Sequence, residues 1–169
     1  RPCRIHDYDM AYLDLGAGPP TVLVHGSLND FRTWAAVLGP LTAGRRVVAP
    51  SLRHYFPELW DGMDGRLSID QHVDDMITFI EALDVGPVDL IGHSRGGHIS
   101  FRLASKRPDL LRKLVLAEPG GTLEECLVPD DAPIAGSLEY VAASSAKVLA
   151  GDHESGLKVF VDGVNGPGT

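Results

Sequence analysis

The sequence has 169 residues, which suits one domain with a hydrophobic core of its own, and its 44% hydrophobic and 22% charged residues argue against wholesale disorder. The net charge of −8 and the absence of a basic block argue against nucleic acid as a partner. No apolar run approaches the roughly 20 residues that a membrane-spanning helix needs, so a membrane is not an expected partner either.

Strands and helices alternate along the first two thirds of the chain. Residues 4–15 alternate loosely between polar and apolar and predict a strand or a hairpin. Four short apolar runs are typical of strands buried on both faces: Thr21–His25, Arg46–Ala49, Val88–Ile91 and Leu114–Ala117. Helices are expected between them, over about 31–41, 69–84 and 95–106. The alternation predicts an α/β fold, a mostly parallel sheet with flanking helices.

Two of the predicted helices have recognisable patterns. In 69–84, Ser68 and Gln71 have the spacing of a capping box, and Gly86-Pro87 follows the end. In 31–41, one face gathers five apolar residues: Phe31, Trp34, Val37, Leu38 and Leu41. We therefore expect both helices to bury one face against the sheet.

The sequence pattern changes after residue 118. Residues 122–160 contain no strong strand pattern, whereas 137–150 and 152–162 favour helices. We therefore expect an α/β core over residues 1–118 and a helical segment over 119–169. The two cysteines, Cys3 and Cys126, form neither a disulfide framework nor a zinc motif. They fit a reducing compartment and thus a cytoplasmic protein.

The strongest motif is G-x-S-x-G, formed by Gly92, Ser94 and Gly96 between a predicted strand and a predicted helix. This is the pattern of a nucleophile elbow. The turn is so tight that side chains two residues before and after the serine would meet the neighbouring backbone, which favours glycine there. The serine hydroxyl then stands clear of the sheet at a helix N-terminus, where the dipole and free amides stabilise negative charge. The alternative is a plain strand–helix turn in which Ser94 only caps the helix.

A second element, His25-Gly26-Ser27-Leu28, ends the predicted strand 21–25. Together with the following helix, the strand that ends at Pro50 and the elbow, it resembles the alpha/beta-hydrolase fold family over roughly residues 8–118. The resemblance implies an oxyanion hole made by the backbone N–H groups of Ser27 and Arg95, with Leu28 as a second candidate for the first donor. His25 itself is interpreted as a packed, hydrogen-bonded core histidine.

The resemblance also implies a general base and an acid after the nucleophile, in the order Ser, Asp/Glu, His. Only His98 and His153 follow Ser94. His98 lies in the elbow helix and His153 in the segment that resembles the family's helical cap, so neither is the expected base. Glu118, at the carboxyl end of the strand 114–117, is the candidate acid, although most members place theirs after a further strand. We therefore expect the base outside this chain, in a further segment or in another chain, and an uncovered strand edge at 114–117.

These features predict a serine hydrolase that cleaves an ester or a related acyl bond of a small molecule, with no cofactor and no metal. Carbon–carbon bond hydrolysis and cofactor-free haloperoxidase chemistry use the same constellation. The resemblance implies aspartate at the nucleophile position of dehalogenases and epoxide hydrolases, so Ser94 argues against both. Leu28, His54 and Tyr55 are the candidate substrate contacts, with loop packing as the alternative for His54 and Tyr55. The rival function is a non-catalytic module that binds a ligand or a partner.

Overall fold

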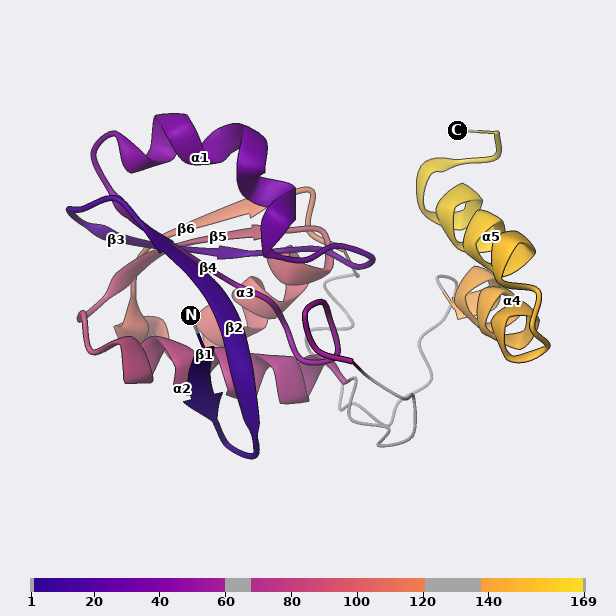
Figure 1. Ribbon diagram of the computed structural model, residues 1–169, viewed down its shortest axis with the longest axis horizontal. Helices are drawn as coiled ribbons and strands as arrows, with labels where there is room; N and C mark the ends of the chain where they lie inside the picture. Colours follow the sequence, from indigo (N-terminus) through magenta and orange to yellow (C-terminus); the bar gives the residue numbers. More distant parts are fainter. Residues whose placement is uncertain (1, 60–67, 121–137, 169) are drawn as a thin grey trace. The chain divides into compact units, whose positions relative to one another are not determined.

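The computed structural model describes residues 2–59, 68–120 and 138–168. Cys126 and the predicted cap residues 121–137 thus lie outside the described residues. The chain divides into two compact units, Arg1–Thr122 and Leu123–Thr169, and each is described by itself. The first, called the core unit, contains these elements (Figure 1): β1 (Pro2–Ile5), β2 (Tyr8–Leu15), β3 (Pro20–Val24), η1 (Phe31–Trp34), α1 (Ala35–Thr42), β4 (Arg46–Pro50), α2 (Ile69–Leu83), β5 (Val88–His93), α3 (Arg95–Lys106), η2 (Pro108–Leu110) and β6 (Leu111–Ala117).

The strands form one mixed sheet in the order β1-β2-β4-β3-β5-β6. β1 and β2 form the predicted hairpin and pair antiparallel, and β2 is antiparallel to β4. The four strands predicted from apolar runs, β3, β4, β5 and β6, pair in parallel, with Val22 opposite both Val48 and Leu90. The predicted α/β fold with a mostly parallel sheet is confirmed.

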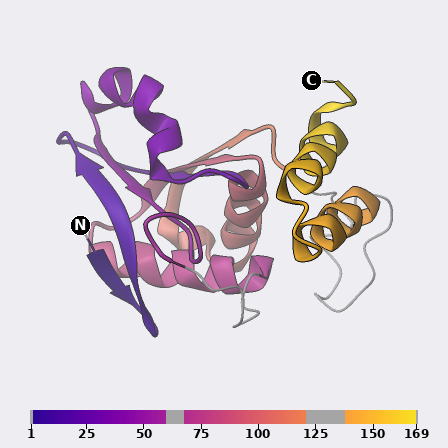
Figure 2. The same ribbon diagram turned by 45° about the vertical axis from the view of Figure 1, so that its right-hand side comes forward.

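Helices cover both faces of this sheet, as Figures 1 and 2 show from two directions: α1 lies on one face, and α2 and α3 lie on the other. Successive residues of a strand point to opposite faces. Val22 and Val24 join the core cluster with α2 and α3, whereas Leu23 joins the cluster with η1 and α1. Because both faces are buried, the central strands are mostly apolar, and Asp89 of β5 pairs with Arg45 and Arg112.

Two helix details differ from the sequence-based expectation. Ser68 caps α2 by accepting the N–H of Gln71, but the Gln71 side chain donates to Asp75 instead of returning to the cap, so only half of a capping box forms. The helix predicted over 31–41 begins as a 3₁₀ turn, and α1 follows it. A 3₁₀ turn has fewer residues per turn, which shifts the helix phase and leaves Val37 42% exposed.

β6 is the edge of the sheet in the part of the chain that the structure describes. Its Leu114 and Val115 are exposed, by 36% and 51%, whereas their register partners on β5 are buried (Leu90) and partly buried (Ile91). The expected uncovered edge is confirmed. An apolar edge strand of this kind is a surface on which further backbone can pair.

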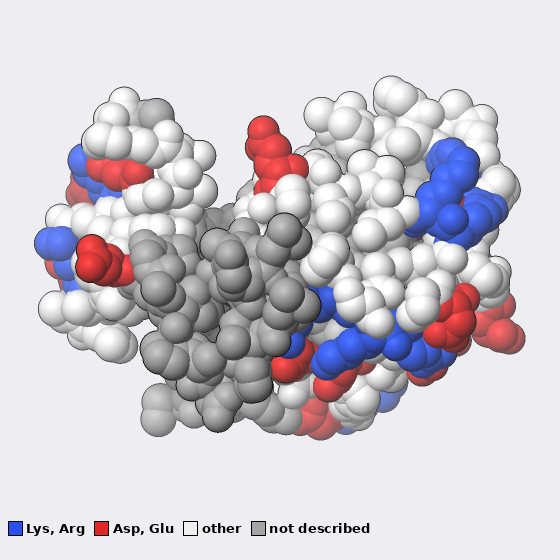
Figure 3. Space-filling view, turned by 180° about the vertical axis from the view of Figure 1, so that it is seen from behind, with Lys and Arg blue, Asp and Glu red and all other residues white. Residues whose placement is uncertain are grey.

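Charged side chains join α2 to α3 on the outer side of the core unit. Arg102 pairs with Asp70 at 2.6 Å, Lys106 contacts Asp70 and Asp74, and Arg107 contacts Glu81. Figure 3 shows Lys/Arg and Asp/Glu side chains next to one another along the lower part of this unit. These pairs link one helix to the other.

The described part of the second unit, residues 138–168, forms two helices, α4 (Leu138–Leu149) and α5 (His153–Asn165), which confirm the helices predicted near 137–150 and 152–162. Small residues let them pack closely, since Gly156 lies against Val148 and Ser144 donates to the Gly156 carbonyl. The division predicted at residue 118 between core and cap remains a prediction. No helix within the described ranges is long and apolar enough to cross a membrane.

Candidate active site

Ser94 has a strained backbone at the junction of β5 and α3, with φ 51° and ψ −122°. This conformation is costly for a residue with a side chain and is found where the surroundings enforce it. The neighbouring glycines explain how the turn closes. A Cβ on Gly92 would collide with the Gly96 carbonyl oxygen, and a Cβ on Gly96 would collide with the Val24 and His25 carbonyl oxygens. The structure therefore builds the elbow that the motif predicts.

Backbone strain gathers at the carboxyl edge of the sheet. The residues with positive φ include one shortly after each parallel strand: Leu28 after β3, His54 after β4, Ser94 after β5 and Glu118 after β6. In open α/β sheets, ligands bind at this edge. Four strained residues at one edge mark it as the candidate site.

Hydrogen bonds fix the elbow from several sides. The Ser94 N–H donates to the Ala117 carbonyl at 3.0 Å, and the Ser94 carbonyl accepts from Gly97 at 2.8 Å, His98 at 3.1 Å and Gly120 at 3.0 Å. Arg95 is the first residue of α3, so its N–H belongs to the helix donors that have no intrahelical acceptor. An oxyanion hole is built from backbone N–H groups at such a helix start, close to the residue that attacks the substrate.

The turn after β3 packs directly against the nucleophile. A Cβ on Gly26 would lie 3.0 Å from the Ser94 Cβ. Ser27 follows in the chain, and its carbonyl accepts from the Asn29 side chain at 3.0 Å. Leu28 is 61% exposed. The structure thus brings the Ser27 turn and the N-terminus of α3 to Ser94, while the roles of the two amides remain predictions.

His25 is the packed core histidine that the sequence predicts. It is fully buried, and its Nδ1–H donates to the Gly26 carbonyl at 2.8 Å while its Nε2 accepts the Leu52 N–H at 3.0 Å. Burial lowers the pKa of His25. A neutral ring with both nitrogens in use holds the turn after β3 to the loop after β4.

The other candidate residues occupy different places. Glu118 is exposed and lies just beyond the register pair His93–Ala117, next to Ser94 along the edge. His54 has a side chain only 2% exposed that contacts Glu58 at 3.1 Å, so little of it can meet a substrate. His98 Nδ1 bonds the Gly120 carbonyl at 3.0 Å. His153 starts α5 in the second unit. The assignments of Glu118, His54 and Tyr55 to the site remain predictions.

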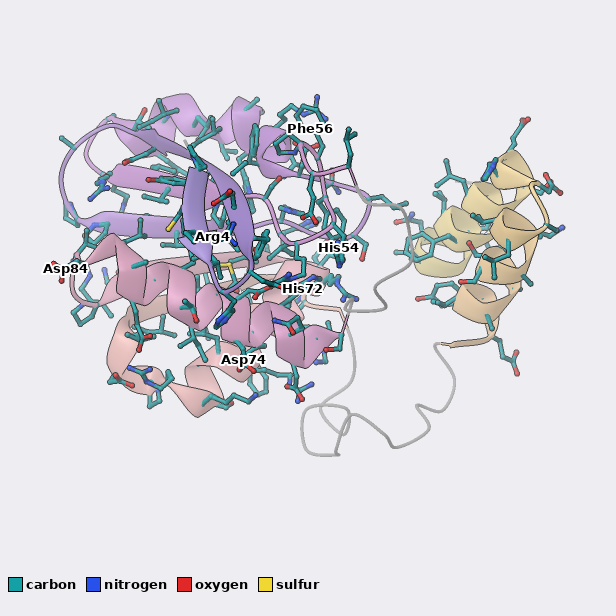
Figure 4. The ribbon with its side chains drawn as sticks, turned by 60° about the horizontal axis from the view of Figure 1, so that its bottom comes forward. Arg4, His54, Phe56, His72, Asp74 and Asp84 are labelled. Atoms are coloured by element: carbon teal, nitrogen blue, oxygen red, sulfur yellow. The ribbon has the colours of Figure 1, made fainter. Side chains whose placement is uncertain are left out.

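One polar cluster was missed from the sequence: the side chains of His72 and Arg95. His72 on α2 is fully buried, and its Nδ1 lies 3.4 Å from Arg95 Nη2. The Tyr55 ring lies 6.3 Å from the His72 ring, and Figure 4 shows His54 and His72 at the same end of the core unit. The signal was the spacing, because 72 and 76 share the apolar face of α2.

No group of three or more His, Cys, Asp or Glu side chains that could hold a metal ion occurs among the residues that the structure describes. The candidate site brings together Ser94 on the elbow, the backbone at the start of α3 and in the turn after β3, and the buried side chains of His25 and His72. Fold and site together define an α/β protein with a nucleophile elbow at the carboxyl edge of its sheet.

Comparison with known proteins agrees with this description of the fold. A sequence model of the alpha/beta hydrolase fold matches residues 19–161, and the chain belongs to this family. The chain is 34% identical over 112 residues to the 2-hydroxymuconate semialdehyde hydrolase of Pseudomonas sp. (strain CF600), covering 64% of this chain and 39% of that protein. It is 34% identical over 118 residues to a haloalkane dehalogenase of Mycolicibacterium paratuberculosis, covering 69% and 38%.

Among solved structures, the epoxide hydrolase VrEH1 from Vigna radiata is similar with a TM-score of 0.64 and 27% identity, over 68% of this chain and 36% of that one. The chain thus spans less than two fifths of the length of these relatives. They are hydrolases and a dehalogenase, so the family is settled and the particular reaction is a matter for proposal.

Proposed function

We propose that this chain carries the nucleophile of a serine hydrolase that cleaves an ester or a related acyl bond in a small molecule. The observation that supports this most is the strained Ser94 on the elbow between β5 and α3. Holding a serine in this conformation costs free energy, which a helix cap alone does not explain. A serine favours acyl transfer over the dehalogenase and epoxide hydrolase reactions, for which the resemblance implies aspartate.

In the proposed reaction, a histidine removes the hydroxyl proton while Ser94 Oγ bonds to the substrate carbonyl carbon. The carbonyl oxygen becomes an oxyanion that accepts from the amides of Ser27 and Arg95. When the intermediate collapses, the bond to the leaving alcohol breaks, and the alcohol takes the proton from the histidine. Water then attacks the acyl carbon and gives a proton to the same histidine. The bond between that carbon and Ser94 Oγ breaks, Ser94 takes the proton from the histidine, and the acid is released.

The histidine is proposed to lie outside residues 1–169, in a segment of the full protein or of another chain, with Glu118 as the candidate orienting acid. Support comes from the family order of nucleophile, acid and base. Support also comes from the two histidines that follow Ser94 in the chain, since His98 bonds the Gly120 carbonyl and His153 begins α5 of the second unit. The name of the Pseudomonas relative, a semialdehyde hydrolase, supports hydrolysis as the reaction class.

Labelling with a fluorophosphonate probe tests this proposal, because the probe reacts with activated serines. It is applied to this chain, to the longest protein that its gene encodes, and to Ser94→Ala of each. Labelling of the long form that Ser94→Ala abolishes supports the proposal. Labelling of the 169-residue chain as well contradicts the external histidine. No labelling of either form contradicts the hydrolase and favours a binding module.

A further inference from the structure

The side chain of Arg95 has a defined position, but neither the G-x-S-x-G motif nor the proposed reaction gives it a role. Its backbone follows the nucleophile, while its guanidinium reaches α2 and lies 3.4 Å from His72. We propose that this contact is a positioning device that holds the first turn of α3 against α2 and so fixes the Arg95 amide. The proposal rests on the proposed function, in which that amide is an oxyanion donor.

The chemistry of the two side chains determines the direction of the contact. A guanidinium can only donate, so His72 Nδ1 accepts and the ring carries its hydrogen on Nε2. His72 is fully buried. Burial, and next the nearby Arg95 charge, lower the pKa of His72 to about 3. The ring is therefore neutral at physiological pH and keeps the lone pair that Arg95 requires.

Further side-chain contacts lead from His72 toward the turn after β3, which carries Ser27, the other proposed oxyanion donor. The centre of the Tyr55 ring is 6.3 Å from that of the His72 ring and 4.9 Å from that of the His25 ring. His25 in turn donates to the Gly26 carbonyl, one residue before Ser27. A continuous set of packed side chains thus links the first turn of α3 to the turn after β3.

Such a restraint matters because oxyanion donors act only at about 2.7–3.1 Å from the developing charge. The first turn is also one of the two ends at which a helix frays. Gly97 and His98 both donate to the Ser94 carbonyl at the start of α3. Their hydrogen bonds therefore report whether this turn stays closed.

Three substitutions test the contact. Arg95→Met removes the donor and keeps an apolar stem, His72→Leu removes the acceptor, and His72→Asn keeps an acceptor near the position of Nδ1. The matched control is Arg102→Met. Arg102 also joins α3 to α2, through Asp70 at 2.6 Å, but it lies about two turns further along α3.

The variants are made in the longest form that the gene encodes, and hydrolysis of p-nitrophenyl acetate is measured. Arg95→Met and His72→Leu are expected to lower kcat roughly tenfold or more with KM within about twofold, since they disturb a transition-state contact. His72→Asn should recover most of the rate, and Arg102→Met should keep it. Equal kcat in Arg95→Met and in the control would overturn the proposal.

Amide exchange of Gly97 and His98 separates this proposal from the proposed function, because it needs no activity. Faster exchange in Arg95→Met and His72→Leu than in the wild type and Arg102→Met is the expected result. Unchanged exchange overturns the positioning role even if the protein hydrolyses esters. Faster exchange in a protein that no probe labels would contradict the hydrolase while retaining the contact.

Discussion

At the scale of single residues, the candidate site depends on a serine in a backbone conformation that suits glycine. Its φ of 51° and ψ of −122° place Ser94 outside the regions that residues with a Cβ prefer. The flanking glycines let the backbone of β3 approach within contact of the elbow. The hydroxyl is thus presented at the expense of local stability.

This strain predicts the relative stability of two inactive variants. Ser94→Gly should be more stable than Ser94→Ala by about 1 kcal/mol, because glycine adopts the observed conformation without a Cβ clash. Ordinarily, glycine is the less stable of the two. Urea unfolding of both variants measures the difference. If Ser94→Ala were the more stable, the elbow would not be strained.

The close approach at Gly96 gives a second residue-scale prediction. Gly96→Ala should lower the free energy of unfolding by about 3 kcal/mol, because its Cβ would meet the Val24 and His25 carbonyl oxygens, which belong to the sheet backbone. Gly44→Ala is the control, since a Cβ at Gly44 meets nothing within 4 Å. It should change stability by less than about 1 kcal/mol. Similar losses in both variants would contradict this packing.

At the scale of elements, α2 packs against α3 and carries His72, which contacts Arg95 at the start of α3. Its cap, Ser68, accepts the Gln71 N–H at 3.0 Å. Ser68→Ala should cost about 1 kcal/mol by leaving that donor without its acceptor. Ser105→Ala, on the exposed side of α3, should be neutral or slightly stabilising, because alanine is the better helix former. Thermal unfolding of both compares them, and equal melting temperatures would argue against the cap.

The buried histidine of α2 predicts a pH dependence of stability. The pKa of His72 is about 3 when folded and about 6.5 when unfolded, so between these values the unfolded state binds the extra proton. The contribution of His72 to stability is complete above pH 6.5. It falls by about 1.4 kcal/mol per pH unit as the pH drops through this window.

His72→Asn isolates this contribution because the other titrating groups are kept. The free energy of unfolding of the variant, measured by urea between pH 7 and 4, should fall less steeply than that of the wild type. Parallel curves would show that His72 does not titrate on unfolding in this window.

Elements were largely predictable where the pattern was repetitive. The parallel strands followed from short, mostly apolar runs, and α3 spans 95–106 as expected. The elbow was predictable because the tight turn leaves no room for a side chain at the positions of its glycines. The buried face of α1 was harder to predict, since a 3₁₀ turn before the helix rotates Val37 to the surface. The Arg95–His72 contact depends on how α2 packs against α3, which no local pattern specifies.

At the scale of the whole molecule, the candidate site is assembled from the carboxyl ends of four parallel strands. The proposed nucleophile, amide donors and carboxylate come from the ends of three strands that are far apart in the sequence, and the parallel sheet brings these ends to one edge. The open edge at β6 is consistent with more sheet being added there.

The central claim is that Ser94 forms an acyl-enzyme, and trapping that intermediate tests it most directly. The longest protein that the gene encodes is mixed with p-nitrophenyl acetate, quenched in acid within one turnover, digested and analysed by mass spectrometry. The account predicts an acetyl group on the peptide that contains Ser94, and none in Ser94→Ala. Turnover of the ester with acetyl on another residue, or an unchanged rate in Ser94→Ala, would contradict it.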